Sequence, residues 1–356
     1  AAMFYTGLAQ AIGEKVVHIF GTGENSLMLG LMLVGTVLSS VLSNTGTCAC
    51  LMPVALGICA ASKNPASRQL LPMAYACGWG GIITLVGTPP NIIGSGALTA
   101  AGLPGFSFFE FAWIGIPLSV AGILYMLLIG KYLLPKAELD ADQEIEQEIE
   151  ATTHDKKKQV ISGVILLACV TVMALNLKFI SLEMTAIIGA LVCVLTGCLT
   201  EKQAYSSIDW VTIFLFAGMM PVSTAMDKTG AGKLIANWAV GLMGGEPTPL
   251  IVTIVLFSIS CFLTQFMSNT ASAALLCPIG IAIAKQLNAD PKAVVMAIAV
   301  AASCAFATPV GTPPCTLVLG PGGYKFMDYV KCGTGLVLVC FVVSLIVIPM
   351  VWPFFP

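Results

Sequence analysis

Long apolar runs fill most of this chain, and short polar or Gly-Pro motifs interrupt them. Runs of about 20 apolar residues predict membrane-spanning helices. We expect such spans at 111–134, 159–177, 182–199, 209–227 and 331–352. Two further kinds of apolar segment are interrupted near their middle. We expect helical hairpins at 24–60 and 248–287, and helices broken at a Gly-Thr-Pro-Pro turn at 69–101 and 292–320.

The interruptions recur in the same order in the two halves of the chain. Ser-Asn-Thr at 43–45 returns at 268–270, an offset of 225, and Val-Gly-Thr-Pro-Pro at 86–90 returns at 310–314, an offset of 224. Thr-Gly at 6–7 likewise returns at 229–230, and each copy opens a short amphipathic segment, 7–19 and 228–243. Such self-similarity indicates a duplication. The predicted domains are a first repeat at 1–134, an acidic linker at 135–158 and a second repeat at 159–356.

The second repeat carries three apolar segments, 159–227, before its Thr-Gly word, whereas the first has only five residues there. We therefore expect the first repeat to be incomplete at its N-terminus. A complete unit would cross the membrane an odd number of times, which inverts one copy relative to the other. That is the inverted-repeat plan of secondary transporters, so the expected fold is an all-α polytopic membrane protein.

Composition supports a membrane protein. The chain is 57% hydrophobic and 10% charged, with a mean hydropathy of +0.94, whereas soluble domains carry about 25% charged residues. The net charge of −2 leaves no basic surface for nucleic acid. The thirteen Cys are scattered through apolar segments and are interpreted as small hydrophobic residues.

The distribution of Lys and Arg predicts the orientation. If the 135–158 linker faces the cytoplasm, eleven of the sixteen basic residues lie inside and five outside, as the positive-inside rule requires. The first hairpin then enters from the cytoplasm and the second from the opposite side. We expect a multi-pass protein of the bacterial plasma membrane with a cytoplasmic linker.

The Ser-Asn-Thr and Gly-Thr-Pro-Pro motifs offer oxygen ligands at mid-membrane depth. Irregular backbone is tolerated there only inside protein or beside a watery cavity. Each half supplies hydroxyls, one amide and the carbonyl of a Gly that precedes Thr-Pro-Pro. These groups are Ser43, Asn44, Thr45, Gly87 and Thr88 in the first half, and Ser268, Asn269, Thr270, Gly311 and Thr312 in the second. Freed carbonyls suit a cation such as Na⁺, and amides at helix N-termini suit an anion.

A simpler interpretation is that these residues only cap helices and end them. The paired recurrence in register favours a binding site instead. Asn91, after the first Pro-Pro pair, fits a ligand or a cap equally well. Every Asp and Glu falls at a predicted loop or span end, and so does every Lys and Arg. A proton-coupled transporter normally needs an ionisable group inside the membrane. Na⁺ coupling is therefore expected.

The paired Ser-Asn-Thr and Val-Gly-Thr-Pro-Pro words resemble those of the divalent anion/sodium symporter family, citrate-transporter-like permeases within the ion transporter superfamily. The resemblance covers essentially the whole chain. It implies a homodimeric elevator transporter, not an enzyme, in which hairpins and broken helices carry Na⁺ and a small anion while scaffold spans (159–227 here) hold the dimer in the lipid bilayer. The anion would be a di- or tricarboxylate such as succinate or citrate, or sulfate.

The same resemblance implies a ligand set for each ion. One Na⁺ site would use Ser39, Ser43, Asn44 and Gly87, and the other Thr264, Ser268, Asn269 and Gly311. The anion would contact Asn44, Thr45, Thr88, Asn269, Thr270, Thr312 and Pro313. Two features bear on specificity. No His, Lys or Arg adjoins either motif, which favours symport over exchange, and Cys315 stands where the family usually has Asn.

Two other classes remain as alternatives. A cation/proton antiporter or metalloid-oxyanion permease of the same superfamily would be favoured by an acidic residue at mid-membrane. A non-transporting membrane sensor would need an attached soluble domain, for which the 135–158 linker is too short. The sequence leaves open the anion and the number of Na⁺ ions carried with it.

Overall fold

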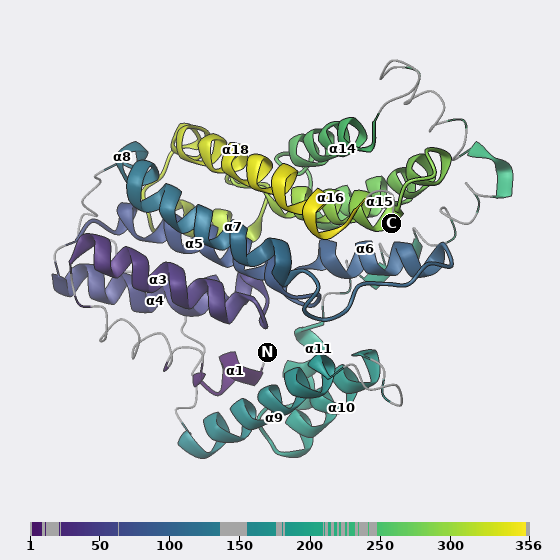
Figure 1. The fold of residues 1–356 in the computed structure, drawn as a ribbon. Coiled ribbons are helices and arrows are strands. Elements are labelled where there is room, and N and C mark those ends of the chain that lie inside the picture. The colour runs from purple at the N-terminus through teal and green to yellow at the C-terminus, as the bar shows by residue number, and fades with distance from the viewer. Residues whose placement is uncertain are drawn as a thin grey trace.

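The computed structural model describes residues 2–8, 23–62, 64–135, 155–175, 182–208 and 248–353, with isolated residues elsewhere. The described residues are helical apart from turns and connecting segments, which confirms the predicted all-α class (Figure 1). The predicted amphipathic segments 7–19 and 228–243, the span 209–227 and most of the linker lie largely outside the described residues.

The first half contains a helical hairpin, a broken helix and a long apolar helix. Its elements in chain order are α1 (Ala2–Tyr5), α3 (Glu24–Ser39), α4 (Asn44–Ser62), the short 3₁₀ helix η1 (Ala66–Arg68), α5 (Leu70–Gly80), the 3₁₀ turn η2 (Gly81–Ile83), α6 (Pro89–Ala100), α7 (Ala112–Tyr125), the π-helical turn η3 (Met126–Gly130) and α8 (Lys131–Leu133). Pro89 and Pro90 occupy the first positions of α6, where a missing N–H costs nothing. The proline pair therefore starts the second part of the broken helix.

The second half repeats this order after additional helices, of which the structure describes α9, α10 and α11. Its elements are α9 (Lys156–Ala174), α10 (Leu182–Leu195), α11 (Glu201–Ser206), α14 (Pro249–Leu263), α15 (Asn269–Gln286), α16 (Pro291–Ser303), α17 (Pro313–Leu319) and α18 (Phe326–Val351). α9 begins three residues before the predicted span because the Asp155 side chain accepts a hydrogen bond from the Lys157 N–H and caps the helix.

The two halves pack against each other reciprocally. α4 of the first half contacts α17 of the second, and α15 of the second contacts α6 of the first. Likewise α5 contacts α17 while α16 contacts α6, and α7 packs on α18. Reciprocal contacts of this kind are the signature of a two-fold relation between two copies of one unit. The duplication in the sequence is thus a duplication in space, with one continuous apolar core running through both copies.

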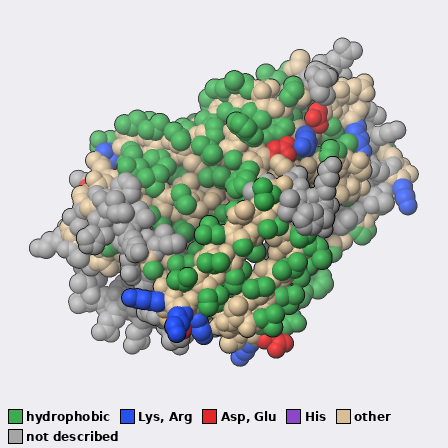
Figure 2. All heavy atoms as spheres, turned by 60° about the horizontal axis from the view of Figure 1, so that its bottom comes forward, with side chains coloured by type: hydrophobic (Ala, Val, Ile, Leu, Met, Phe, Trp, Pro, Cys, Tyr) green, Lys and Arg blue, Asp and Glu red, His purple; other side chains and the backbone are tan. Residues whose placement is uncertain are grey.

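Two described helices pass the length and composition test for crossing a membrane, Ala112–Leu133 and Phe326–Val351. The hairpin arms and half-helices are shorter, because each ends at a turn in the middle of its apolar segment. α9, α10 and α11 form a smaller group with α1 (Figure 1). Its outer surface is strongly apolar, since Leu167 is 68% exposed and Leu195 85%. Figure 2 shows this side of the molecule, where hydrophobic side chains spread over the surface and few charges interrupt them.

Candidate functional site

The Asn44 amide lies at the centre of a cluster of oxygens where the first hairpin meets the first broken helix. Ser39 Oγ is 2.7 Å from one amide atom of Asn44, and the same atom lies 3.1 Å from the Cys77 carbonyl oxygen and 3.2 Å from the Gly87 carbonyl oxygen. Ser39 Oγ also donates to the Cys77 carbonyl at 2.7 Å. The last residue of α3, the first of α4, the end of α5 and the turn before α6 thus converge on one point.

The Asn269 amide has the same surroundings in the second half. One of its amide atoms lies 2.8 Å from Thr264 Oγ1, 3.1 Å from the Ala302 carbonyl oxygen and 3.0 Å from the Gly311 carbonyl oxygen. Thr264 Oγ1 donates to the Ala302 carbonyl at 2.6 Å. The second cluster therefore reproduces the first at offsets of 225 or 224 residues, including one backbone carbonyl in each, that of Cys77 or Ala302, which lies outside the sequence motifs.

The chemistry of these clusters suits a small hard cation. With the amide nitrogen turned inward, Asn44 donates to the hydroxyl and both carbonyls. With the amide oxygen turned inward, the converging groups of each cluster are all oxygens and only the Ser39 or Thr264 hydroxyl is a donor, so a cation between them would balance the remaining oxygens. Backbone carbonyls freed at a helix break are the groups that coordinate Na⁺ in transporters and replace its hydration shell. The residues present therefore fit Na⁺.

Glycine is required where the backbone segments meet. A Cβ on Gly311 would lie 2.7 Å from the Thr264 carbonyl oxygen, and a Cβ on Gly81 would lie 2.9 Å from Cγ of Asn44. Neither contact is tolerable for a real side chain. The close approach that brings the carbonyls to the amides thus depends on the missing side chains, which explains the Gly of the Gly-Thr-Pro-Pro turn.

Helix N-termini surround the same region. Thr88 precedes α6 with φ −142° and ψ 143°, and Thr312 precedes α17 with φ −142° and ψ 137°. Both threonines are buried and make no capping hydrogen bond with their side chains. Cys48 Sγ, in the first turn of α4, lies 3.7 Å from the Pro314 carbonyl oxygen at the start of α17. The N-terminal ends of α4, α6 and α15 carry positive partial charge that attracts anions.

The structure separates the predicted residues into groups. Within each half it brings together the hydroxyl, the amide and the Gly carbonyl: Ser39, Asn44 and Gly87 in one, Thr264, Asn269 and Gly311 in the other. Ser43 and Ser268 are exposed, and their hydroxyls accept the N–H of Gly46 and of Ala271, both at 3.2 Å. These two serines therefore cap α4 and α15, and each keeps a lone pair for a further contact.

The predicted anion ligands differ in exposure. Thr45 and Pro313 are exposed, Thr270 is half-buried, and Thr88 and Thr312 are buried. Asn91, for which a ligand and a cap were equally expected, is neither a helix cap nor exposed to a ligand. It is fully buried, and its Nδ2 donates to the Thr84 carbonyl at 2.8 Å. It holds the turn that leads to Gly87.

Sequence reasoning missed several groups at these clusters. The carbonyls of Cys77 and Ala302 carry no sequence signature of their own, although they obey the 225-residue offset. The hydroxyls of Thr47 and Ser272 also share that offset. They lie one helical turn beyond Asn44 and Asn269, are fully buried, and have no hydrogen-bond partner among the described residues. A search for polar residues at equal offset would have found them.

Two ion pairs join elements of the described part of the chain. Glu24 pairs with Arg68 at 2.7 Å, and Glu110 pairs with Lys292 at 2.7 Å. Burial raises the pKa of Glu110, but the hydrogen bonds from Lys292, the Ser107 N–H and Trp352 outweigh it and hold the pKa below its ordinary value. Within the part of the chain described here, no three His, Cys, Asp or Glu side chains gather to hold a metal ion.

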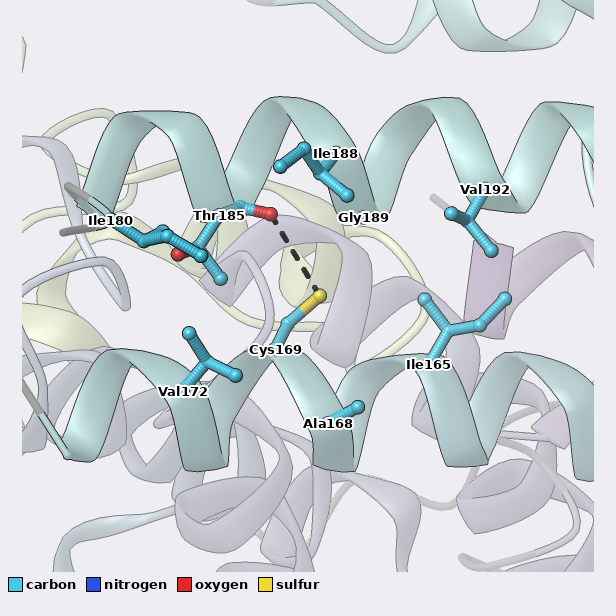
Figure 3. A pocket seen from close by; sticks show the side chains of 9 residues that line it. All are labelled: Ile165, Ala168, Cys169, Val172, Ile180, Thr185, Ile188, Gly189 and Val192. Atoms are coloured by element: carbon cyan, nitrogen blue, oxygen red, sulfur yellow. Dashed lines mark hydrogen bonds between the residues drawn. The ribbon is translucent and has the colours of Figure 1, made fainter. Parts of the chain in front are cut away.

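A separate pocket lies between α9 and α10 (Figure 3). Its volume is about 220 Å³, and its walls are apolar apart from Cys169 and Thr185, whose carbonyl oxygen is 4.0 Å from Cys169 Sγ. No charged residue lines it, and its walls are almost entirely apolar, so it lacks the polar groups expected of an anion site. The oxygen clusters around Asn44 and Asn269 remain the candidate site.

Comparison with known proteins places the chain in a family. The model of the citrate transporter family matches residues 1–239 and, in a second match, 171–355. The chain belongs to the citrate transporter family. It is 34% identical to an uncharacterised transporter of Haemophilus influenzae over 370 aligned positions, which cover 99% of this chain and 78% of that one. It is 25% identical to the sodium-dependent dicarboxylate transporter SdcS of Staphylococcus saprophyticus, covering 99% and 74%.

A solved structure has the same fold. The YdaH transporter of Alcanivorax borkumensis matches with a TM-score of 0.68 at 14% identity, over 98% of this chain and 83% of that one. Proteins of the citrate transporter family are integral membrane proteins that move small molecules. Membership therefore accounts for the apolar outer surfaces of α7, α9, α10 and α18, which suit contact with lipid.

Proposed function

We propose that this protein is a secondary active transporter that couples the movement of a divalent or polyvalent anion to Na⁺ symport. The anion is a di- or tricarboxylate such as succinate or citrate, or sulfate. The observation that carries the proposal is the pair of oxygen clusters around Asn44 and Asn269, which match in every partner. The sodium dependence of the distant relative SdcS supports the same coupling.

In this mechanism each cluster binds one Na⁺ that travels with the anion. Ser39, Ser43, Asn44 and Gly87 supply oxygens on one side, and Thr264, Ser268, Asn269 and Gly311 supply them on the other. Both amides have an acceptor atom and a donor atom. An amide that turns its oxygen toward Na⁺ turns its NH₂ group away, where it can donate to the anion.

The anion is held by neutral donors. Thr45, Thr88, Thr270 and Thr312 offer hydroxyls beside the starts of the helices, and Pro313 forms part of the wall. Because none of the predicted ligands is charged, the negative charge of the anion has to be balanced by the two Na⁺ ions and the positive helix ends. This charge balance makes the anion and Na⁺ depend on each other for binding, which is the basis of coupling.

We further propose the elevator arrangement. The hairpins and broken helices form a rigid transport unit with a shared core, and α9 with α10 belongs to a scaffold that remains in the bilayer. The full-length protein would act as a homodimer in the bacterial plasma membrane, with the 135–158 linker in the cytoplasm. The smaller packing group of α9, α10, α11 and α1, with its own apolar cluster, supports a separate scaffold.

The test is anion uptake by the full-length protein in liposomes. Radiolabelled succinate, citrate and sulfate are offered with an inward Na⁺ gradient or with K⁺ in its place. We expect uptake of at least one anion to require Na⁺, and Asn44→Ala and Asn269→Ala to reduce it about tenfold or more, because each removes an ion ligand worth about 1.5–3 kcal/mol. The matched control is Asn25→Ala, an exposed residue of α3 that contacts Lys131.

Two results would refute the proposal. Uptake that proceeds equally well without a Na⁺ gradient would exclude symport with Na⁺. Uptake that survives both asparagine substitutions would exclude these clusters as the ion sites. A thermal-shift panel of anions, each measured in NaCl and in KCl, identifies the anion independently of transport, since a bound ligand raises the melting temperature.

A further inference from the structure

The two broken helices differ at the residue that follows the second proline. In the first half this residue is Asn91 and in the second it is Cys315, at the 224-residue offset. Their backbones are equivalent, since the Asn91 N–H donates to the Thr88 carbonyl at 3.2 Å and the Cys315 N–H to the Thr312 carbonyl at 3.1 Å. The backbone at these two positions is therefore alike, although residues 81–83 form the 3₁₀ turn η2 in the first half and residues 304–306 form no helix in the second.

Asn91 is the brace of the first turn, meaning a buried side chain that holds the turn by hydrogen bonds to its backbone. Its Nδ2 donates to the Thr84 carbonyl at 2.8 Å and lies 3.4 and 3.5 Å from the carbonyl oxygens of Gly81 and Ile82. These are carbonyls that the end of α5 leaves without helical partners. By holding them, Asn91 fixes the path of the chain from η2 to Gly87, whose carbonyl faces Asn44.

Cys315 cannot do the same, because a thiol is a weak and short donor. Another residue spans the second turn instead. Gln265 follows Thr264 directly, and its Nε2 donates to the carbonyls of Cys261 at 2.8 Å and Cys304 at 3.0 Å. Its Oε1 accepts the Ala307 N–H at 2.9 Å. The Gln265 side chain is thus hydrogen-bonded both to α14, at Cys261, and to the irregular segment after α16, at Cys304 and Ala307.

The counterpart of Gln265 in the first half is Ser40, whose hydroxyl donates to the Val37 carbonyl of its own helix at 2.7 Å and to no other described residue. The backbone contact at this position is otherwise the same in both halves. Thr84 Oγ1 donates to the Ser40 carbonyl at 2.5 Å, and Thr308 Oγ1 donates to the Gln265 carbonyl at 2.6 Å. The residue that acts as the brace therefore differs between the halves. In the first half it is Asn91, on the broken helix, and in the second it is Gln265, on the hairpin.

We propose that Gln265 is the positioning residue of the second ion site and replaces there the function of Asn91 in the first. It holds the segment between Ala302 and Gly311, whose carbonyls face Asn269, and it does so from the hairpin turn that carries Thr264. Because the brace belongs to the hairpin, a movement of the second hairpin displaces two carbonyls of the ion site. In the first half the equivalent brace stays within the broken helix. This inference rests on the proposed function, since it assumes that the clusters bind Na⁺.

The experiment exchanges the braces in the full-length protein. Gln265→Ser installs the residue of the first half, Cys315→Asn installs its Asn brace, and the double variant carries both. The melting temperature is measured over a Na⁺ series at constant ionic strength with K⁺, without anion. We expect Gln265→Ser to raise the half-saturating Na⁺ concentration about tenfold, the effect of losing well-aligned hydrogen bonds around a ligand. We expect the double variant to return within about threefold of the wild type, since the backbone at 315 matches that at 91.

The control is Ser40→Ala, which removes a hydroxyl bonded only to its own helix and should leave the Na⁺ response unchanged. If Gln265→Ser does not fold, Gln265→Met replaces it, because it keeps the length of the side chain, adds no charge and removes the hydrogen bonds to Cys261, Cys304 and Ala307. A Na⁺ response equal to that of the wild type, or a loss that Cys315→Asn does not repair, would overturn the assignment. A wild-type protein with no Na⁺ response would instead refute the proposed function, so the two failures are distinguishable.

Discussion

Gly81→Ala tests the ion site around Asn44 without removing any of its ligands. Gly81 has φ −62° and ψ −20°, a conformation that Ala adopts without strain. The obstacle is space, because the new Cβ would lie 2.9 Å from Cγ and 3.0 Å from Nδ2 of Asn44, with Oδ1 closer still. An ordinary carbon–carbon contact is about 3.5 Å. The amide therefore has to move by at least about 0.6 Å, the difference between these two distances.

The cost follows from the contacts that this movement disturbs. The amide lies 2.7 Å from Ser39 Oγ, 3.1 Å from the Cys77 carbonyl oxygen and 3.2 Å from the Gly87 carbonyl oxygen. Losing alignment with one or two of these oxygens costs about 1.5–3 kcal/mol, which weakens Na⁺ binding about 10- to 100-fold. At a Na⁺ concentration ten times the wild-type Kd, stabilisation by Na⁺ is then expected to fall from about 1.4 to about 0.4 kcal/mol or less.

The assay is the melting temperature of the purified protein during a Na⁺ titration against K⁺. The matched control is Gly57→Ala in α4, where a Cβ meets no atom within 4 Å. A well-folded Gly81→Ala protein whose titration curve coincides with that of the wild type would show that the Asn44 amide is not an ion ligand. An equal loss in Gly57→Ala would show that the effect is not specific to the site.

Three other substitutions test individual interactions that stabilise the fold. Glu110→Gln is expected to lower the melting temperature at neutral pH. Because the folded protein holds the pKa of Glu110 below its ordinary value of 4.5, this carboxylate stabilises the fold above that pH, and the stabilisation is lost as the pH falls through the lowered pKa. A difference in melting temperature between the two proteins that does not shrink as the pH falls below 4.5 would contradict this. Thr47→Val removes a buried, unpaired hydroxyl at nearly constant shape and should raise the free energy of unfolding by about 1 kcal/mol. Chemical denaturation that shows a clear loss of stability would instead indicate that this hydroxyl has a hydrogen-bond partner. Trp79→Phe breaks the 2.8 Å hydrogen bond from the indole to Thr36 Oγ1, in a site where both residues are buried, and should cost about 2–3 kcal/mol; a cost below 0.5 kcal/mol would contradict it.

Much of the architecture follows from the sequence alone. A proline pair after Gly-Thr has only one comfortable place, at the start of a helix, so the breaks before Pro89 and Pro313 are local properties of the chain. The equal spacing of the two sets of words predicts a duplicated unit. The family resemblance further implied that Ser39 belongs with Asn44 and Thr264 with Asn269, and these pairs do meet in the structure.

Only the tertiary structure decided what completes each cluster. The Cys77 and Ala302 carbonyls could not be read from the sequence, because every residue carries a carbonyl and only the fold frees one and aims it. The same is true of Asn91 and Gln265, since a hydrogen bond between residues up to 42 positions apart depends on how the hairpin docks on the broken helix. Side-chain type and spacing determine the parts of this site, and long-range packing determines which oxygens face each amide.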